Sequence, residues 1–462
     1  MTAYSPPPNG FRTFVIVWAT QSISVIGSAL TFFAINIWLT QTLYPQPEQK
    51  PALALALSLV ALAFGLPTIF GAPLAGAWAD RHDRRRTMLV CDLLSGCLSL
   101  LLTTLVLFDL LQLWSLIGLM ALFAVLSAFH GAAFDTSYAM LVPPEQLPRA
   151  NGMMQTLWSF SGVLSPALAA TIIALPTLAR AGDLPQWLSP ALAWFRDGAA
   201  LAMLIDSISF FVVAGVLLFV AIPSPERSDL GADGKRRSIW ADVGVGASYI
   251  WQRRPMLWLL GTFTVVNFVS SGRGVYQPLI VKFDLAGDWA ARGFSFESAL
   301  ALLGTSIGVG GLIGGLFITV WGGLQRRRVY GVLIPMIISG AAQTIYGLSH
   351  WLYLSAAMTL VAMAMMPIMN AHSQTIWQAQ TPRELQGRVF SVRRVIAQCT
   401  TPLSTTLAGL FGGLFDPGLA VAALGLIMLV FCTAQLFNPY LMRVEDKAWL
   451  DELAARSAVK GV

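Results

Sequence analysis

The sequence predicts an all-α integral membrane protein in which twelve transmembrane helices form two six-helix bundles. Composition is the first reason, because 56% of the 462 residues are hydrophobic and only 11% are charged. Soluble domains carry about 25% charged residues. The mean hydropathy of +0.67 points the same way. The other two reasons are the many long apolar segments and the placement of Lys and Arg between them.

A transmembrane helix needs about 20 mostly apolar residues, and twelve segments of this chain meet that requirement. The first six cover residues 13–39, 52–78, 88–108, 112–141, 149–175 and 199–222, and the second six cover 255–281, 297–321, 329–348, 351–378, 390–414 and 418–441. None of them alternates polar and apolar residues with period two, so the pattern excludes a transmembrane barrel.

The basic residues predict how the chain crosses the membrane. If both termini lie on one side, 23 of the 29 Lys and Arg residues fall on that side and five on the other, while Arg273 lies within a predicted span. Loops rich in Lys and Arg stay in the cytoplasm. We therefore expect a multi-pass protein of the plasma membrane with both termini cytoplasmic. The net charge of +6 belongs to these loops, which argues against nucleic-acid binding.

The order of the spans predicts an N-terminal bundle over residues 1–222, a C-terminal bundle over 255–442 and a cytoplasmic tail over 443–462. The interval 223–254 is polar and predicts a cytoplasmic linker. Apolar residues at 239, 240, 243, 247, 250 and 251 recur with helical period, so we expect an amphipathic helix on the inner membrane surface. Basic runs at 84–86 and 326–328 follow the second and eighth spans; either a duplicated six-helix unit or two unrelated basic loops accounts for them.

The polar gap after the second span carries a charged motif that must lie at a membrane face, because each charge in lipid costs about 2.5–3.5 kcal/mol. The motif G-x-x-x-D-R-x-x-R-R-R is formed by Gly76, Asp80, Arg81, Arg84, Arg85 and Arg86. It resembles the loop between helices 2 and 3 of major facilitator superfamily transporters, with Asp83 where many members have Gly. Residues 141–152, 206–210 and 381–391 resemble the drug/proton antiporter branch that includes macrolide efflux proteins and the enterobactin exporter.

The resemblance implies a conformational latch at this motif. In the family, the Asp at the position of Asp80 pairs with helix ends of the other half and holds the outward-open state. The expected partners here are Arg388, Arg393 and Arg394, at the start of the eleventh span. The alternative is that the arginines only set the topology of the loops.

Ionisable residues within spans are costly, so each is a functional candidate. The candidates for coupling to a proton gradient are Asp135, His130, Arg273 and Asp206. For Asp135, a pair with an Arg at the inner face is the alternative to a coupling proton. Helix packing is the alternative for Asp206, and a local hydrogen bond is the alternative for His130. Asp92 and Glu297 are interpreted as interfacial and structural.

In the family fold, helices 1, 4, 7 and 10 line a central cavity, which implies a further set of candidates. Amide and aromatic side chains suit a bulky amphipathic solute. The substrate-cavity candidates on these spans are Gln21, Asn36, Asn267, Tyr276, Gln277, Asn370 and Gln374.

The resemblance implies a secondary active transporter that exports a bulky organic solute, a macrolide-like drug or a siderophore, by alternating access and in exchange for protons. A flippase for lysophospholipids or other lipids with the same fold is the alternative, and a transporter-like sensor without turnover is another. The expected partners are the small-molecule substrate, protons and the lipid bilayer of a bacterial inner membrane, with the protein acting as a monomer.

Several chemistries are not expected. The sequence has no G-x-x-x-x-G-K-[ST] phosphate loop, so it predicts no ATPase and no other enzyme. Its four cysteines and four histidines lack the spacing of a disulfide framework or a metal site, and no cofactor is expected. A Pro-rich N-terminus leads directly into the first span, so no cleavable signal peptide is predicted.

Overall fold

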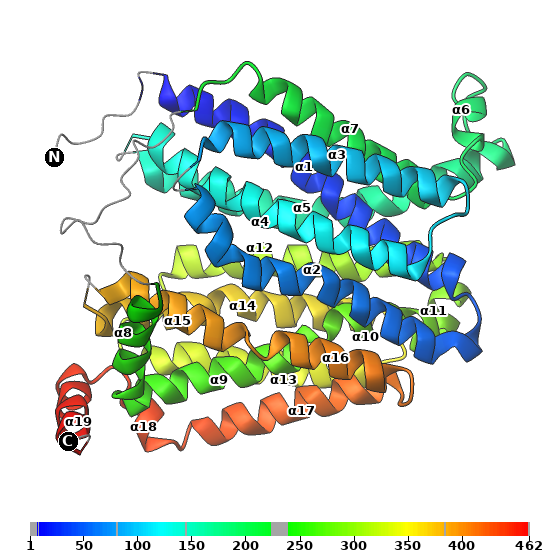
Figure 1. Ribbon diagram of the computed structural model, residues 1–462. Helices are drawn as coiled ribbons and strands as arrows, with labels where there is room; N and C mark the ends of the chain where they lie inside the picture. Colours follow the sequence, from blue (N-terminus) through cyan, green and yellow to red (C-terminus); the bar gives the residue numbers. More distant parts are fainter. Residues whose placement is uncertain are drawn as a thin grey trace. The chain divides into compact units, whose positions relative to one another are not determined.

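The computed structural model describes residues 7, 9–79, 82–143, 146–222, 239–382 and 385–460. Within this described part all regular elements are helices, with no β-strand. The helices of the first half are α1 (Gly10–Ile37), α2 (Lys50–Ala79), α3 (Arg84–Leu107), α4 (Leu113–Leu141), α5 (Leu147–Ala181), α6 (Ser189–Ala193) and α7 (Gly198–Leu217) (Figure 1). Those that follow are α8 (Ile239–Trp251), α9 (Arg254–Ser271), α10 (Arg273–Leu279), α11 (Ala286–Ala291), α12 (Phe296–Trp321), α13 (Arg328–Leu348), α14 (Leu352–Gln380), α15 (Gln386–Gln398), α16 (Thr401–Gly412), α17 (Pro417–Gln435), α18 (Pro439–Met442) and α19 (Lys447–Lys460).

Eleven helical runs in the described residues are long and apolar enough to cross a membrane. Three of them are composite. α1 continues through a π-helical end to Leu43, a 3-10 turn over Pro47–Gln49 precedes α2, and α9 continues through α10 and a π-helical turn to Asp284. The segment predicted at 390–414 is present as two shorter helices, α15 and α16. Pro402, in the first turn of α16, has no N–H with which to continue a helix. The predicted all-α membrane fold is therefore confirmed, with its eleventh span broken in the middle.

The chain divides into two compact units. Unit 1 comprises Met1–Asp229 and Glu297–Thr305, and unit 2 comprises Leu230–Phe296 and Ser306–Val462.

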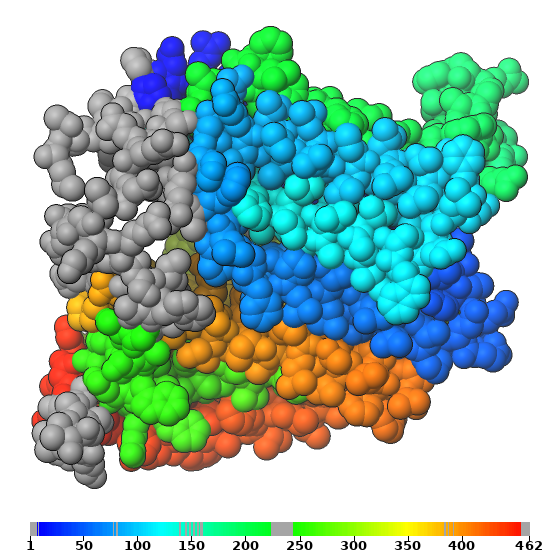
Figure 2. All heavy atoms as spheres, viewed as in Figure 1, coloured from blue at the N-terminus to red at the C-terminus, as the bar shows by residue number. Residues whose placement is uncertain are grey.

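In unit 1, α7 packs along both α1 and α3, and α4 packs along α2. Phe14, Met88 and Leu217 are fully buried in its hydrophobic core. Figure 2 shows α2, α3 and α4, coloured blue to cyan, on one face of this unit. Phe70 and Leu74 of α2 are 69% and 70% exposed. Such large exposed apolar side chains suit a surface that contacts lipid.

In unit 2, α13 packs against both α14 and α17. Trp377 of α14 lies fully buried in the core of this unit. Two glycines let α12 approach α14 closely. A Cβ added at Gly310 would lie 2.3 Å from a carbonyl oxygen of α14, and one added at Gly314 would lie 2.0 Å from another. Small residues one turn apart are the usual way in which membrane helices come into close contact.

The interval between the two halves contains α8, whose bounds are those of the helix expected from the apolar periodicity. It packs on α15 within unit 2. At Gly246 an added Cβ would lie only 2.5 Å from the backbone oxygen of Arg388. The Tyr249 hydroxyl donates to the carbonyl oxygen of Gln380, at the end of α14, and Arg253 lies over the Tyr249 ring at 3.8 Å. These contacts attach α8 to unit 2, and residues 223–238 of the predicted linker lie outside the described part of the chain.

Candidate functional site

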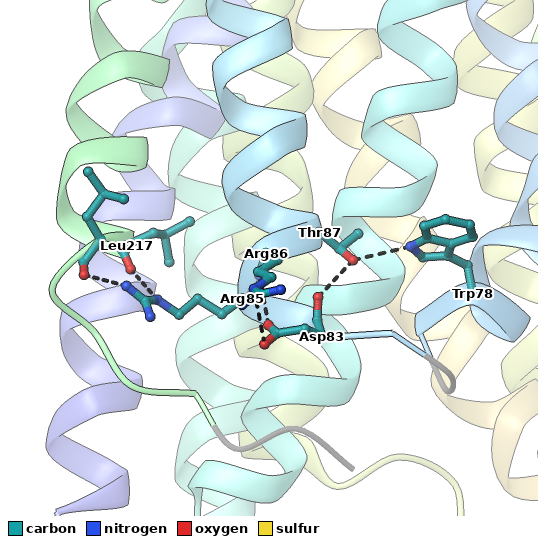
Figure 3. A network of polar contacts seen from close by, with 7 residues as sticks. Trp78, Asp83, Arg85, Arg86, Thr87 and Leu217 are labelled. Carbon is teal, nitrogen blue, oxygen red and sulfur yellow. Dashed lines mark hydrogen bonds and ion pairs between the residues drawn. The ribbon is translucent and has the colours of Figure 1, made fainter. Parts of the chain in front are cut away.

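The charged motif lies at the turn from α2 to α3, and Asp83 organises this turn (Figure 3). Its carboxylate accepts the backbone N–H of Arg86 at 2.9 Å and so caps the start of α3. The Thr87 hydroxyl donates to the backbone carbonyl of Asp83 at 2.9 Å and accepts the indole N–H of Trp78 at 3.2 Å. Trp78 in turn stacks on His82 with 3.6 Å between the ring centroids. The Asp that departs from the family pattern is thus the helix cap.

Two arginines of the motif bind the carboxyl ends of neighbouring helices in unit 1. Arg85 donates to the carbonyl oxygen of Leu217 at 2.7 Å and also to that of Leu218, at the end of α7 (Figure 3). Arg84 is only 6% exposed and donates to the carbonyl oxygens of Ala79 at 3.3 Å and Thr136 at 3.0 Å. The last carbonyls of a helix have no partner within that helix and carry partial negative charge. The motif therefore holds the ends of α2, α4 and α7 at the start of α3.

The other motif positions are less constrained. Gly76 has no atom within 4 Å of an added Cβ, and the Arg86 side chain is 86% exposed. Asp80 and Arg81 lie outside the described residues. The latch expected at Asp80 stays a prediction.

The arginines expected as latch partners differ in their surroundings. Arg393 of α15 donates to the Gln374 side chain at 2.8 Å and to the Ser373 hydroxyl at 3.2 Å. Its guanidinium also lies over the Trp377 ring at 5.1 Å. Arg394 is exposed, and Arg388 is partly buried.

The corresponding loop of unit 2, between α12 and α13, is held from α14 by a histidine. His372 is 3% exposed. Its Nε2 accepts the backbone N–H of Leu324 at 2.8 Å, and its Nδ1 lies 2.8 Å from the carbonyl oxygen of Ile368. Only the neutral tautomer with the proton on Nδ1 satisfies both contacts. The two basic loops are thus both fixed by a side chain, but by different chemistry.

A hydroxyl-lined pocket within unit 1 holds the carboxylate of Asp206. This side chain on α7 is 1% exposed. It accepts hydrogen bonds from Thr31 at 2.7 Å and Ser28 at 3.4 Å, both on α1, and from Ser99 of α3 at 3.3 Å. A Cβ added at Gly27 would lie 2.8 Å from the carboxylate, so this position needs the smallest residue. The contacts join α1, α3 and α7, as the packing interpretation of Asp206 requires.

A second polar cluster in unit 1 brings three spans together around Asp92. This residue of α3 is 2% exposed. Its Oδ1 lies 3.3 Å from Nε2 of His130 on α4, and its Oδ2 accepts from the Gln21 amide of α1 at 3.4 Å. The His130 contact has the distance of an ion pair but not the alignment of a hydrogen bond.

The remaining candidates of unit 1 are Asp135 and Asn36, and the charge of Asp135 acts on His130 of this cluster. Asp135 is exposed on α4. The Asn36 amide donates to the carbonyl oxygen of Phe32 at 2.8 Å, within its own helix.

In unit 2 the candidates fall into two groups. Asn267 donates from α9 to the carbonyl oxygen of Ala397 at 2.7 Å, and Asn370 is exposed on α14. Arg273, Tyr276 and Gln277 instead line a small cavity inside unit 2, together with Gln343 and Tyr346 of α13.

The sequence interpretation missed three residues of these clusters. Asp92 is predicted to be interfacial, although it lies about one turn inside the predicted span and two turns inside α3. Gln343 and Tyr346 were not considered. Their spacing of three residues places them on one face of a helix, and polar groups one turn apart in an apolar span are the signal that would have found them. Among the described residues no group of three or more His, Cys, Asp or Glu could hold a metal ion.

Comparison with known proteins shows the family to which these long apolar helices and the motif loop belong. Residues 17–402 match the Major Facilitator Superfamily. The chain belongs to this superfamily. It is a multi-pass membrane transporter rather than an enzyme, as the sequence predicted.

Curated relatives of this superfamily member are named for efflux. Macrolide efflux protein A of Streptococcus pyogenes is 25% identical over 400 residues, which cover 86% of this chain and 89% of that protein. Multidrug efflux pump Tap of Mycolicibacterium fortuitum is 26% identical over 406 residues, covering 85% and 89%. Neither name refers to siderophores, so siderophore export gains no support from these two relatives.

Solved transporter structures share the fold. A bacterial homolog of the human lysosomal transporter Spinster matches with a TM-score of 0.62 at 17% identity, covering 98% of this chain and 96% of the other. A bacterial homologue of the iron transporter ferroportin matches with a TM-score of 0.60 at 14% identity, covering 91% and 99%. At such identities the likeness concerns the fold alone.

Proposed function

We propose that this superfamily member is an exporter of bulky organic drugs of the macrolide kind, driven by proton antiport and working by alternating access. The efflux names of the curated relatives support the direction of transport and the class of solute. In this proposal the two halves of the chain are the moving bodies, α8 belongs to their connector, and both termini are cytoplasmic.

The observation that carries the proposal of proton coupling is the buried contact between Asp92 and His130. Both residues lie in helical runs that can span a membrane, where an ionisable side chain is costly unless it has a function or a partner. When the pair holds one proton on the imidazole, its net charge is zero. When that proton leaves, a single negative charge remains on Asp92 in a low-dielectric interior, which is much less favourable.

Proton binding at this pair therefore changes the charge of the unit 1 interior by one. The Gln21 amide donates to Asp92 and stabilises its carboxylate in both states. A conformation in which water reaches the pair favours the charged, deprotonated state, whereas one that excludes water favours the neutral, protonated state. The free energy of proton binding therefore differs between the two conformations, and this difference is the coupling free energy that an antiporter requires.

The test measures accumulation of a radiolabelled macrolide in bacterial cells with and without the protein. We expect lower accumulation with the protein, restored to the level of empty cells by a protonophore. Asp92→Asn and His130→Gln should each abolish the difference, since either change removes proton exchange at the pair. Asp183→Asn and His350→Gln, at exposed positions, are the matched controls and should export normally. Export that survives the protonophore would refute proton coupling.

The same cells distinguish the lipid flippase alternative. A fluorescent lysophospholipid should cross the membrane equally fast with and without the protein if the solute is a drug. Protein-dependent movement of the lipid, without any change in macrolide accumulation, would replace drug export by lipid transport.

The latch belongs to this proposal as well. Arg84, Arg85 and Arg393 already have partners within their own units. Arg394 is exposed, and it remains an expected partner of Asp80 in this proposal. Because the latch acts on the change of conformation and not on folding, we expect Asp80→Asn to slow transport without lowering the melting temperature. Transport at the normal rate would leave the arginines with a role in topology and helix capping only.

A further inference from the structure

The interior of unit 2 contains a small cavity with convergent polar groups, which the transport proposal does not use. It lies between α10, α13 and α17, and its volume is about 10 Å³. This is close to the room that one water molecule needs. Arg273 enters it from the first turn of α10, and Gln343 and Tyr346 enter it from successive turns of α13.

The polar atoms around this cavity lack partners within the described chain. Arg273 Nη1, the Gln343 side-chain oxygen and the Tyr346 hydroxyl are all buried without a hydrogen bond. Gln343 and Tyr346 are each only 4% exposed. Buried polar atoms are nearly always hydrogen-bonded in native proteins. Three such atoms at one cavity therefore indicate a bound group.

The charge at this site is positive. An Arg side chain keeps its proton in proteins. Arg273 is partly buried as a residue and its Nη1 is fully buried, and an unpaired charge at such a place is very unfavourable. Among the described residues, no carboxylate forms an ion pair with Arg273. Asp284 is the acidic residue that acts on Tyr346, and its Oδ2 is already occupied by the backbone N–H of Gly418 at 3.0 Å.

The available donors select an anion. Arg273 and Tyr346 both present hydrogens to the cavity, and rotating the Gln343 amide by half a turn presents its NH₂ group instead of its oxygen. A water molecule would fill the space but leave the guanidinium charge uncompensated. A halide ion is only slightly larger than water, accepts hydrogen bonds from all sides and supplies the missing charge. A solute of drug size does not fit.

We propose that unit 2 binds a chloride-sized monovalent anion between Arg273, Tyr346 and Gln343. The anion neutralises the guanidinium and joins α10 to α13 inside the C-terminal half. This proposal stands whether or not the protein exports drugs.

The test follows the melting temperature of the purified full-length protein in detergent at constant ionic strength, with gluconate replaced stepwise by chloride or bromide. A ligand that binds only the folded state raises the melting temperature with concentration. We expect a saturable increase with both halides. Tyr346→Phe should raise the half-saturating concentration about tenfold, the loss expected for one hydrogen bond to a charged group. Arg273→Gln should abolish the increase.

Two control variants separate binding from folding. Tyr330→Phe on the same helix and Arg326→Gln in the exposed loop before it should keep the halide response unchanged. If Arg273→Gln does not fold, the contrast between Tyr346→Phe and Tyr330→Phe decides the question. Identical melting temperatures in halide and gluconate would overturn the proposal, as would an unchanged response in Tyr346→Phe. Stabilisation by acetate but not by chloride would also overturn it and assign the site to carboxylates.

Discussion

Replacing Asp206 by Ala tests whether the hydroxyl pocket of unit 1 is a packing feature. The change removes the acceptor for Thr31, Ser28 and Ser99. Hydrogen bonds between membrane helices average about 0.6 kcal/mol and reach about 1.7. The short contact from Thr31, at 2.7 Å, belongs at the upper end. The contacts from Ser28 and Ser99 are longer, and Ser99 keeps a second acceptor in the carbonyl oxygen of Met203. We therefore expect the free energy of unfolding to fall by about 2–3 kcal/mol.

The assay is reversible unfolding in mixed micelles, followed by tryptophan fluorescence. Asp206→Asn keeps one carbonyl oxygen for Thr31 and should lose only about 1 kcal/mol, and Thr31→Val should lose a similar amount. In the double variant these losses should not add, because both remove the same contact. Asp183→Ala, at an exposed loop position, is the control and should change stability by less than about 0.5 kcal/mol.

Two results would refute this reasoning. One is an Asp206→Ala protein as stable as the wild type, which would mean that the pocket adds nothing to folding. The other is an Asp206→Asn protein of unchanged stability that no longer transports, which would give Asp206 the coupling role.

Three further predictions concern the loops. Arg84→Met keeps the aliphatic stem but removes the donor to the carbonyl oxygens of Ala79 and Thr136, so the free energy of unfolding should fall by about 1–3 kcal/mol. Arg86→Met, at an exposed side chain, should have little effect; equal effects would contradict this. His372→Leu leaves the partly buried backbone N–H of Leu324 without its acceptor, so deuterium exchange at this amide should accelerate while exchange in the α2–α3 loop stays constant. Hydrogen bonds from Arg292 and from the backbone of α14 lower the pKa of Asp288. A lowered pKa contributes stability above the unfolded value, and this is lost as the pH falls through the folded value. The protection of the α11 amides from hydrogen exchange, relative to the intrinsic exchange rate at each pH, should therefore fall below about pH 4. Asp288→Asn should remove that acid dependence; unchanged acid dependence in Asp288→Asn would contradict it.

The positions of the helices could be predicted from the sequence, since the apolar length of a span and its helical period are local properties. The bounds of α8 and the existence of spans on both sides of it follow from such patterns. The break between α15 and α16 was missed, although Pro402 marks it. A proline inside an apolar run can either kink a helix or end it, and packing decides which.

The partners of the polar side chains could not be predicted in the same way. Asp92 was taken for an interfacial residue, whereas it is buried between Gln21 and His130. Its contacts depend on how α3 is rotated relative to α1 and α4, and a helical pattern with apolar residues on all sides does not encode that rotation. The same holds for His372, whose partner lies 48 residues away in the chain.

The sequence by itself determined that this chain is a membrane transporter of the major facilitator type. The hydropathy of each span, the basic residues of each loop and the α2–α3 motif are local patterns that need no knowledge of contacts between helices. Only the tertiary structure decided which intramembrane groups meet: Asp206 with hydroxyls, Asp92 with His130, and Arg273 with a cavity. The physical reason is that lipid enforces helices and charge placement locally, whereas the pairing of buried polar groups depends on contacts between helices far apart in the chain.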